Sequence, residues 1–316
     1  MSKPFKTLDE QIEILKNRNL NINDEDHAKE CLLLNNYYNV VNCYGKFLTN
    51  SNDLYINNSE FKEMMAIHTF DREIKKTLFV NSQIIENYFK SIVAYCFSLK
   101  GSRKEYAYFD QSNYNPDKVL ETANLCGIIS KIIKHEKEEK SSAIYHYFYQ
   151  HNDVPIWVLV NYMTFGQIVI MYDVLRIDIK NEINKNINIF ANKNLGKQNI
   201  RLSDSDISLI MDSIKNVRNM VAHNNKLFDY KLRNNCPYVQ AIHAPLDITP
   251  QNSRRSIYDV FILMKLFLNA EQYKNINNCI VNRTKCLAKN VHSISVNEIT
   301  LKLGFPSDWY KTSTIK

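Results

Sequence analysis

The stretch VRNMVAHNNKLFDY, residues 217–230, decides how this chain is interpreted. It places an arginine, Arg218, five positions before a histidine, His223, where a helical pattern of apolar residues ends. Such a pair is an accident of the surface, a structural arrangement or an active site. The residues around the pair have to distinguish among these three.

The residues before the pair predict a helix with one buried face. At about 100° per residue, six apolar side chains fall in a single stripe roughly 120° wide. They are Ile207, Ile210, Met211, Ile214, Val217 and Val221. Ser203, followed three positions later by Asp206, predicts the N-cap of this helix.

Arg218 projects into the same apolar stripe. A guanidinium there costs free energy unless a carboxylate, a phosphate or a partner subunit compensates its charge. One interpretation is therefore a buried structural ion pair with Asp71 or Glu86. For Asp71 a helix-capping or surface role is the preferred interpretation.

His223 lies about 140° around a regular helix from Arg218, so the two side chains diverge. They share a site only if the helix ends between them, or if a second copy of the chain brings its own pair alongside. Asn219, Asn224 and Asn225 are suited to such an ending. The pattern predicts either no joint chemistry or chemistry at a symmetric dimer interface.

The composition favours an all-α protein with the residue balance of a soluble domain. Only 6 Gly and 7 Pro occur in 316 residues, too few for the many turns of a β-sandwich or a barrel. The sequence has no Gly-rich phosphate loop, so we expect no nucleotide chemistry of that kind. The net charge of +7 permits an RNA or DNA partner without requiring one.

Three features predict a cytoplasmic protein that does not cross a membrane. The 7 cysteines include no Cys-x-x-Cys pair, which is typical of reduced thiols rather than of a disulfide framework or a zinc ribbon. The first residues, MSKPFKTLDEQIEIL, carry acids where a signal peptide has an apolar core. The apolar segment 156–175 is interrupted by Asn161, Gln167 and Asp173, so we expect a buried helix there.

Apolar spacing also predicts the remaining helices. They cover residues 8–18, 24–44, 59–99 with a break near 69–71, 131–140, 144–151 and 256–273. Pro155 suits the first turn of a helix that follows it. Residues 230–253, rich in Asn, Cys and Pro, are expected to form a loop.

The run Arg-Asn-x-x-Ala-His at 218–223 resembles the Arg-x4-6-His signature of HEPN ribonucleases. More narrowly, five segments in the same order resemble the Abi-like abortive-infection family, the AbiD/AbiF group of bacterial phage-defence proteins. They lie at residues 3–48, 69–95 (TFDREIKKTLFVNSQIIENYFKSIVAY), 154–172 (VPIWVLVNYMTFGQIVIMY), 218–230 and 303–310 (LGFPSDWY). The family usually has Leu-Arg where this chain has Ile74-Lys75, and Arg where it has Lys226.

The resemblance implies an all-α fold, a HEPN-type helical bundle with additional N-terminal and C-terminal helices. It divides the chain into an N-terminal helical segment (1–58), a HEPN-like core (59–278) that contains the motif helix 203–225, and a C-terminal extension (279–316) that packs on the core. It also implies a homodimer, because HEPN active sites assemble between two such domains.

The implied activity is cleavage of RNA without a metal or another cofactor. Arg218 would hold the scissile phosphate, His223 would transfer protons, and Asn219 would bind the phosphate or orient His223. Six further residues are expected to contact RNA: Lys226, Asn224, Asn225, Lys215, Tyr145 and Tyr147. For the two tyrosines, packing in the core is the competing and favoured interpretation. A metal site at His146, His151 and Asp153 is a weaker alternative, because its spacing matches no known ligand pattern.

Two classes of function remain open from the sequence. The first is an endoribonuclease of phage defence, restrained by a cognate small RNA or by a partner protein. The second is a non-catalytic RNA-binding module in which Arg218 and His223 hold phosphate without cleaving it. Both use the same residues, so the sequence does not separate them.

Overall fold

The protein is all-α in the computed structural model, which describes residues 4–196 and 199–315. In this part of the chain, extended pairing is limited to three isolated bridges: Asn21 with Glu60, Thr49 with Tyr55, and Tyr114 with Leu175. The predicted all-α fold is therefore confirmed. None of the helices in the described ranges is both long and apolar enough to span a bilayer.

The described residues form fourteen α-helices, joined in several places by short 3-10 turns. They are α1 (Leu8–Asn17), α2 (Glu25–Asn35), α3 (Phe61–Lys100), α4 (Val119–Glu136), α5 (Ala143–His151), α6 (Ile156–Leu159), α7 (Phe165–Val174), α8 (Ile177–Asn194), α9 (Asp204–Ala222), α10 (Gln240–His243), α11 (Ile257–Leu263), α12 (Ala270–Asn290), α13 (Val296–Leu301) and α14 (Trp309–Thr312).

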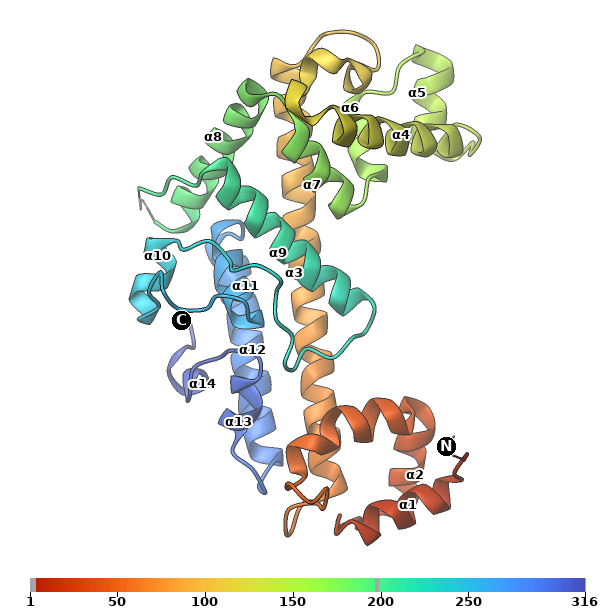
Figure 1. The fold of residues 1–316 in the computed structure, drawn as a ribbon, viewed down its shortest axis with the longest axis vertical. Coiled ribbons are helices and arrows are strands. Elements are labelled where there is room, and N and C mark those ends of the chain that lie inside the picture. The colour runs from red at the N-terminus through yellow and green to blue at the C-terminus, as the bar shows by residue number, and fades with distance from the viewer. Residues whose placement is uncertain (1–3, 197–198, 316) are drawn as a thin grey trace.

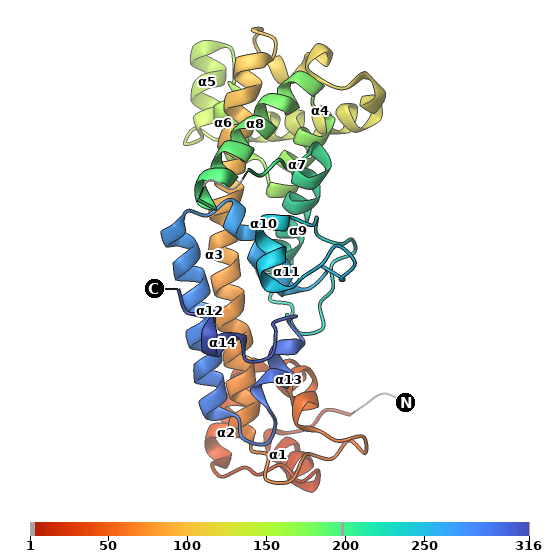
Figure 2. The same ribbon diagram turned by 90° about the vertical axis from the view of Figure 1, so that its left-hand side faces the viewer.

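Helix α3 is the axis of the molecule (Figures 1 and 2). Its 40 residues span about 60 Å at 1.5 Å per residue. Helices α12, α9 and α8 pack along it. In both views α1 and α2 lie at its N-terminal end and α4 to α7 at its C-terminal end.

The break predicted near residues 69–71 is wrong, because α3 runs through them without interruption. Phe70 and Ile74 are buried and continue the apolar face of the helix. Asp71 is fully buried as well, and its charge is compensated by Lys75 one turn later. Tertiary packing therefore overrides the weak local helix propensity of this segment.

Three other predicted helices are shorter than the apolar pattern suggested. The helix expected over 24–44 ends at Asn35, because Asn36 adopts a φ of 67° and a π-helical turn follows. The segment 156–175 divides into α6 and α7, and Thr164 caps α7. The segment 256–273 divides in the same way at Asn269, the N-cap of α12. In the last two cases a short polar side chain begins a new helix inside an apolar run.

Residues 230–253 form a loop that contains the short helix α10 and is organised by one arginine. Arg254 is buried and donates hydrogen bonds to four backbone carbonyls, those of Cys236, Thr249, Pro250 and Asn252. The guanidinium thus satisfies carbonyls that would otherwise lack partners inside the protein.

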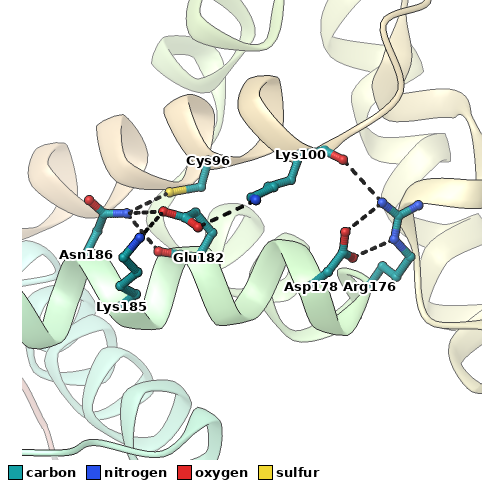
Figure 3. A network of polar contacts seen from close by, with 7 residues as sticks. All are labelled: Cys96, Lys100, Arg176, Asp178, Glu182, Lys185 and Asn186. Carbon is teal, nitrogen blue, oxygen red and sulfur yellow. Dashed lines mark hydrogen bonds and ion pairs between the residues drawn. The ribbon is translucent and has the colours of Figure 1, made fainter.

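A polar network fastens α8 to the C-terminal end of α3 (Figure 3). Arg176 binds Asp178 through two contacts of 2.6 and 2.9 Å, and it donates to the carbonyl of Lys100 at 3.2 Å. That carbonyl belongs to the last turn of α3, where no helical amide remains to bind it. Glu182 lies 3.9 Å from the Lys100 ammonium and strengthens the same junction.

Glu63 fastens the opposite end of α3 to the turn that follows α12. Its carboxylate is buried and accepts hydrogen bonds from the backbone amides of His292 and Ser293, at 2.7 and 2.9 Å, and from the Ser293 hydroxyl. Burial alone would raise the pKa of Glu63, but these hydrogen bonds outweigh it and lower the pKa below 4.5.

We expect Glu63→Gln to destabilise the protein by about 2 kcal/mol near pH 7, because hydrogen bonds to a charged group contribute about 1.5–3 kcal/mol. The pKa of Glu63 is lower in the folded protein than in the unfolded chain. The stabilisation is therefore complete above the unfolded pKa, and it is lost as the pH falls through the folded pKa. Thermal unfolding at neutral pH and at about pH 3 measures the difference. The exposed Glu105, changed to Gln, is the control. A difference in Tm that stays the same at both pH values would contradict this account.

Candidate active site at the end of helix α9

Helix α9 forms as the sequence predicts. The Ser203 hydroxyl accepts a hydrogen bond from the Asp206 amide, and the Asp206 carboxylate binds the Ser203 amide in return. The six apolar residues of the predicted stripe are all buried, five of them completely. This face packs against α3, α7 and α11, and it fixes which residues of α9 reach the surface.

The helix ends at Ala222, and the three residues that follow close its last turn. His223 is the C-cap, and Asn224 adopts a left-handed φ of 55°. The Asn224 amide donates to the carbonyl of Val221 at 3.1 Å, and the Asn225 amide donates to that of Met220 at 3.2 Å. These two bonds form a Schellman motif, in which Asn224 takes the place usually held by glycine. Asn224 and Asn225 therefore end the helix, whereas Asn219 lies within it.

Helix α3 holds this ending in place through Lys75 and Asp71. The Lys75 ammonium donates to the Asn224 carbonyl at 3.2 Å and to the Asn224 side-chain oxygen at 3.1 Å. It also lies 2.6 Å from the Asp71 carboxylate, which accepts hydrogen bonds from the Leu227 amide and the Tyr44 hydroxyl. We call Asp71 and Lys75 the α3 clamp. It binds the turn at both ends, because Lys75 binds Asn224 and Asp71 binds Leu227.

The surface role preferred for Asp71 is therefore wrong. Its side chain is 0% exposed, and its three partners compensate the buried charge. Burial and the Asp71 charge both raise the pKa of Tyr44, so its hydroxyl keeps the proton that it donates. A sequence clue to the clamp exists in the i, i+4 spacing of Asp71 and Lys75, with Ile74 between them in the apolar face.

Arg218 forms an ion pair with Glu86 of α3, in agreement with the interpretation of a structural ion pair. The guanidinium Nε lies 3.6 Å from a carboxylate oxygen of Glu86. The other oxygen of that carboxylate lies 2.8 Å from the Lys90 ammonium. The aromatic ring of Phe79 supports the guanidinium from 5.8 Å. Because Glu86 belongs to the same chain, Arg218 does not need a partner subunit to compensate its charge.

This ion pair leaves Arg218 able to bind a further group. Its side chain remains 27% exposed. Within the described ranges, its buried Nε has no hydrogen-bond partner, since the Glu86 oxygen is too distant for one. Its Nη1 donates to the side-chain oxygen of Asn219 at 3.1 Å, so Asn219 orients Arg218 rather than His223.

His223 is exposed, and the described residues provide no hydrogen bond or ion pair to its imidazole. Its backbone amide still donates to the Asn219 carbonyl, so the chain follows the helical path as far as this residue. The divergence of about 140° from Arg218 therefore persists within one chain. Arg218 and His223 lie at the two edges of one surface strip of α9, with Asn219 and Ala222 between them.

The other residues expected to bind RNA are placed at varying distances from this strip. Lys215 lies one turn before Arg218 and forms an ion pair with Asp212. Asn225 is exposed beside His223, and Lys226 is half-buried. Asn224 already binds Lys75 through its side-chain oxygen, which gives it a structural role. Whether any of them contacts RNA stays a prediction.

Tyr145 and Tyr147 lie on α5, at the end of the molecule where α3 ends, whereas α9 ends near the middle of the molecule (Figures 1 and 2). Their rings pack against Tyr149 and His151, at centroid distances of 4.8 and 5.2 Å. Asp153, a residue of the weaker metal-site alternative, instead accepts a hydrogen bond from the backbone amide of Tyr106. The described ranges contain no group of three or more His, Cys, Asp and Glu side chains placed to hold a metal ion.

The site thus presents a guanidinium with spare donors and an exposed imidazole on the end of a well-anchored helix. A guanidinium recognises a phosphate through two of its N–H groups, and an imidazole exchanges protons near neutral pH. Neither group needs a metal ion for these tasks.

One family model covers the helices that build this site. A family model described as "Abi-like protein" matches residues 30–229. The matched region contains α3 and α9 and ends just after the clamped turn. No curated protein and no solved structure matches the chain.

We expect Lys75→Met to loosen the turn that carries His223. The change leaves the buried Asp71 carboxylate without its cation, and removal of one partner of a buried pair costs about 3–5 kcal/mol. Amide hydrogen exchange of residues 224–227 should become faster than in the wild type. The neighbouring Lys76 is exposed, and Lys76→Met is the matched control. Unchanged exchange in the Lys75 variant would show that the clamp does not hold the turn.

Proposed function

Because the chain belongs to the Abi-like family, we propose that it is a metal-independent endoribonuclease of bacterial phage defence with a HEPN-type site. Arg218, Asn219 and His223 are the proposed catalytic residues. The observation that carries the proposal is the exposed imidazole of His223, which lies on a turn that the α3 clamp fixes. The guanidinium of Arg218 lies on the same strip of α9, and Glu86 contacts it from one side only.

The chemistry follows from the groups present. The RNA 2′-hydroxyl loses its proton and attacks the adjacent phosphorus, and the bond from phosphorus to the 5′-oxygen breaks. His223 transfers one of the two protons, either from the nucleophile or to the leaving oxygen, and water accepts or supplies the other. Arg218 stabilises the added negative charge on the phosphate, and Asn219 fixes the guanidinium. The upstream product then ends in a 2′,3′-cyclic phosphate and the downstream product in a 5′-hydroxyl.

The second candidate function is a non-catalytic RNA-binding module built on the same strip of α9. The absence of a hydrogen bond to His223 from the described residues favours this alternative, because general-base histidines are usually oriented by a third group. In either function, the net charge of +7 supports a cognate small RNA as the restraining partner. Sequencing the RNA that copurifies with the protein tests that partner.

A homodimer is the proposed active form. One chain presents Arg218 and His223 at opposite edges of a strip whose centre is the small residue Ala222. Packing this strip against its copy about a twofold axis would set the Arg218 of one chain opposite the His223 of the other. Ala222 would allow the two helices to approach closely.

We expect the purified protein to cleave single-stranded RNA in EDTA and to leave a 2′,3′-cyclic phosphate. His223→Ala should lower the rate by about 100-fold or more, the usual contribution of a general acid or base. His135 on α4 is also exposed, and His135→Ala is the control. Cleavage that EDTA abolishes and Mg²⁺ restores would exclude this mechanism. RNA binding without cleavage would favour the non-catalytic alternative.

Mixing two inactive variants tests the dimer. Arg218→Ala protein is combined with His223→Ala protein, and RNA cleavage is measured after the subunits exchange. If the site takes Arg218 from one chain and His223 from the other, heterodimers recover part of the activity. If both residues of one chain act together, the mixture stays inactive. An active species that sediments as a monomer would refute the dimer.

A further inference from the structure

A groove runs along α3 beside α6, next to the Arg218 ion pair. Its volume is about 650 Å³. The residues that carry its chemistry are Asn87, Lys90, Ser91 and Tyr95 of α3, and Trp157 and Asn161 of the α6 region. None of the described residues that line it bears a carboxylate. We refer to it as the α3–α6 groove.

Two aromatic side chains of the α3–α6 groove are largely exposed. Tyr95 is 63% exposed and Trp157 is 57% exposed. Large aromatic side chains gain most when a partner covers them, and Trp in particular is usually well covered. Two such rings in one groove offer flat faces on which planar rings can stack. Unpaired nucleobases have such faces, and a duplex keeps its own bases stacked on one another.

The polar side chains of the groove suit the edges of bases. Asn87 and Ser91 are exposed on α3, one on each side of Lys90 along the helix. Asn161 donates from its side-chain nitrogen to the carbonyls of Trp157 and Val158. Its side-chain oxygen therefore remains an acceptor for a donor that enters the groove.

Glu86 joins the groove to the candidate active site. One oxygen of its carboxylate contacts Lys90, a lining residue, and the other faces Arg218. The two cations are thus separated by a single carboxylate. A nucleic-acid backbone that places one phosphate at Arg218 meets the second cation at Lys90, inside the groove.

The length of the groove fits a short single strand. The part of the groove from Lys90 to Ser98 extends about 12 Å along α3, at 1.5 Å per residue. Stacked nucleotides rise about 3.4 Å each, so the groove accommodates roughly three of them. Asn87 and Lys90 then lie at the end near Arg218, and Tyr95 and Trp157 lie further along the strand.

We propose that the α3–α6 groove binds about three unpaired nucleotides of RNA that lead into the Arg218 site. Tyr95 and Trp157 stack on the bases, and Lys90 binds a phosphate. The proposal rests on the proposed function and deepens it, because it makes single-stranded RNA the substrate class and gives its path on the protein.

Binding is measured by the fluorescence anisotropy of a labelled nine-nucleotide single-stranded RNA, with a His223→Ala background to prevent cleavage. Tyr95→Ala and Trp157→Ala should each raise Kd about fivefold or more, as loss of a stacking side chain does. Trp157→Phe keeps a ring and should retain most of the affinity. Tyr38, which is 66% exposed at the N-terminal end of the molecule, gives the control Tyr38→Ala. The same RNA in a duplex should bind weakly and equally to all variants.

A second measurement reports on Trp157 directly. The chain has 2 tryptophans, and Trp309→Phe leaves Trp157 as the remaining one. Stacking of a base on its ring should quench its fluorescence in a saturable way as single-stranded RNA is added. Addition of the duplex should leave the fluorescence unchanged.

The outcomes separate this proposal from the proposed function. If the wild type cleaves RNA while the Tyr95 and Trp157 variants keep full affinity, the groove is not the RNA path and the nuclease stands. If nothing is cleaved but these variants lose affinity, the groove stands and the chain is a binding module. If Tyr95→Ala or Trp157→Ala turns a dimer into a monomer without changing the Kd, the groove is a subunit contact, and the proposal is overturned.

Discussion

The buried pair of Asp71 and Lys75 is the interaction on which the candidate site depends. It joins the N-terminal half of α3 to a turn that lies 149 positions later in the chain, and it does so through the backbone of Asn224 and Leu227. A backbone contact fixes a turn whatever side chains the turn carries. His223 can therefore be exposed and free of structural hydrogen bonds to described residues, and still occupy a defined position.

Much of α9 could be predicted from the sequence, because the information is local. The period of the apolar residues, the Ser203 cap and the ending at the asparagines all involve residues within a few positions of one another. The need of Arg218 for a carboxylate was also evident, since it interrupts an apolar face. The i, i+4 spacing of Asp71 and Lys75 indicates their ion pair, but the contacts of Asp71 with Tyr44 and Leu227 were not predictable, because these residues lie 27 and 156 positions away. The division of two apolar runs into separate helices has a local signal, because Thr164 with Gln167 and Asn269 with Gln272 form capping boxes like that of Ser203 and Asp206. The apolar residues on both sides of these pairs predicted one continuous helix instead.

The electrostatics of the site centre on one carboxylate between two cations. Glu86 faces Arg218 with one oxygen and Lys90 with the other, so the three groups together carry a charge of +1. A phosphate that arrives beside Arg218 therefore meets net attraction, although the guanidinium is already paired. Glu86 faces the buried Nε and Nη1 binds Asn219, so Nη2, which has no hydrogen bond to the described residues, is the donor left for the phosphate. Glu86 thus stabilises the free protein without blocking the arginine.

The unbroken helix α3 also makes the protein more sensitive to insertions and deletions than to substitutions. Glu63, Asp71, Lys75, Glu86 and Tyr95 reach their different partners because one helical register connects them. Many substitutions between these positions leave that register intact. A single inserted or deleted codon would turn every later residue by about 100° around the axis and shift it by about 1.5 Å. An insertion between Lys75 and Glu86 would leave the clamp in place while it rotated Glu86 away from Arg218. The length of this segment is thus expected to be far more constant among relatives than its sequence.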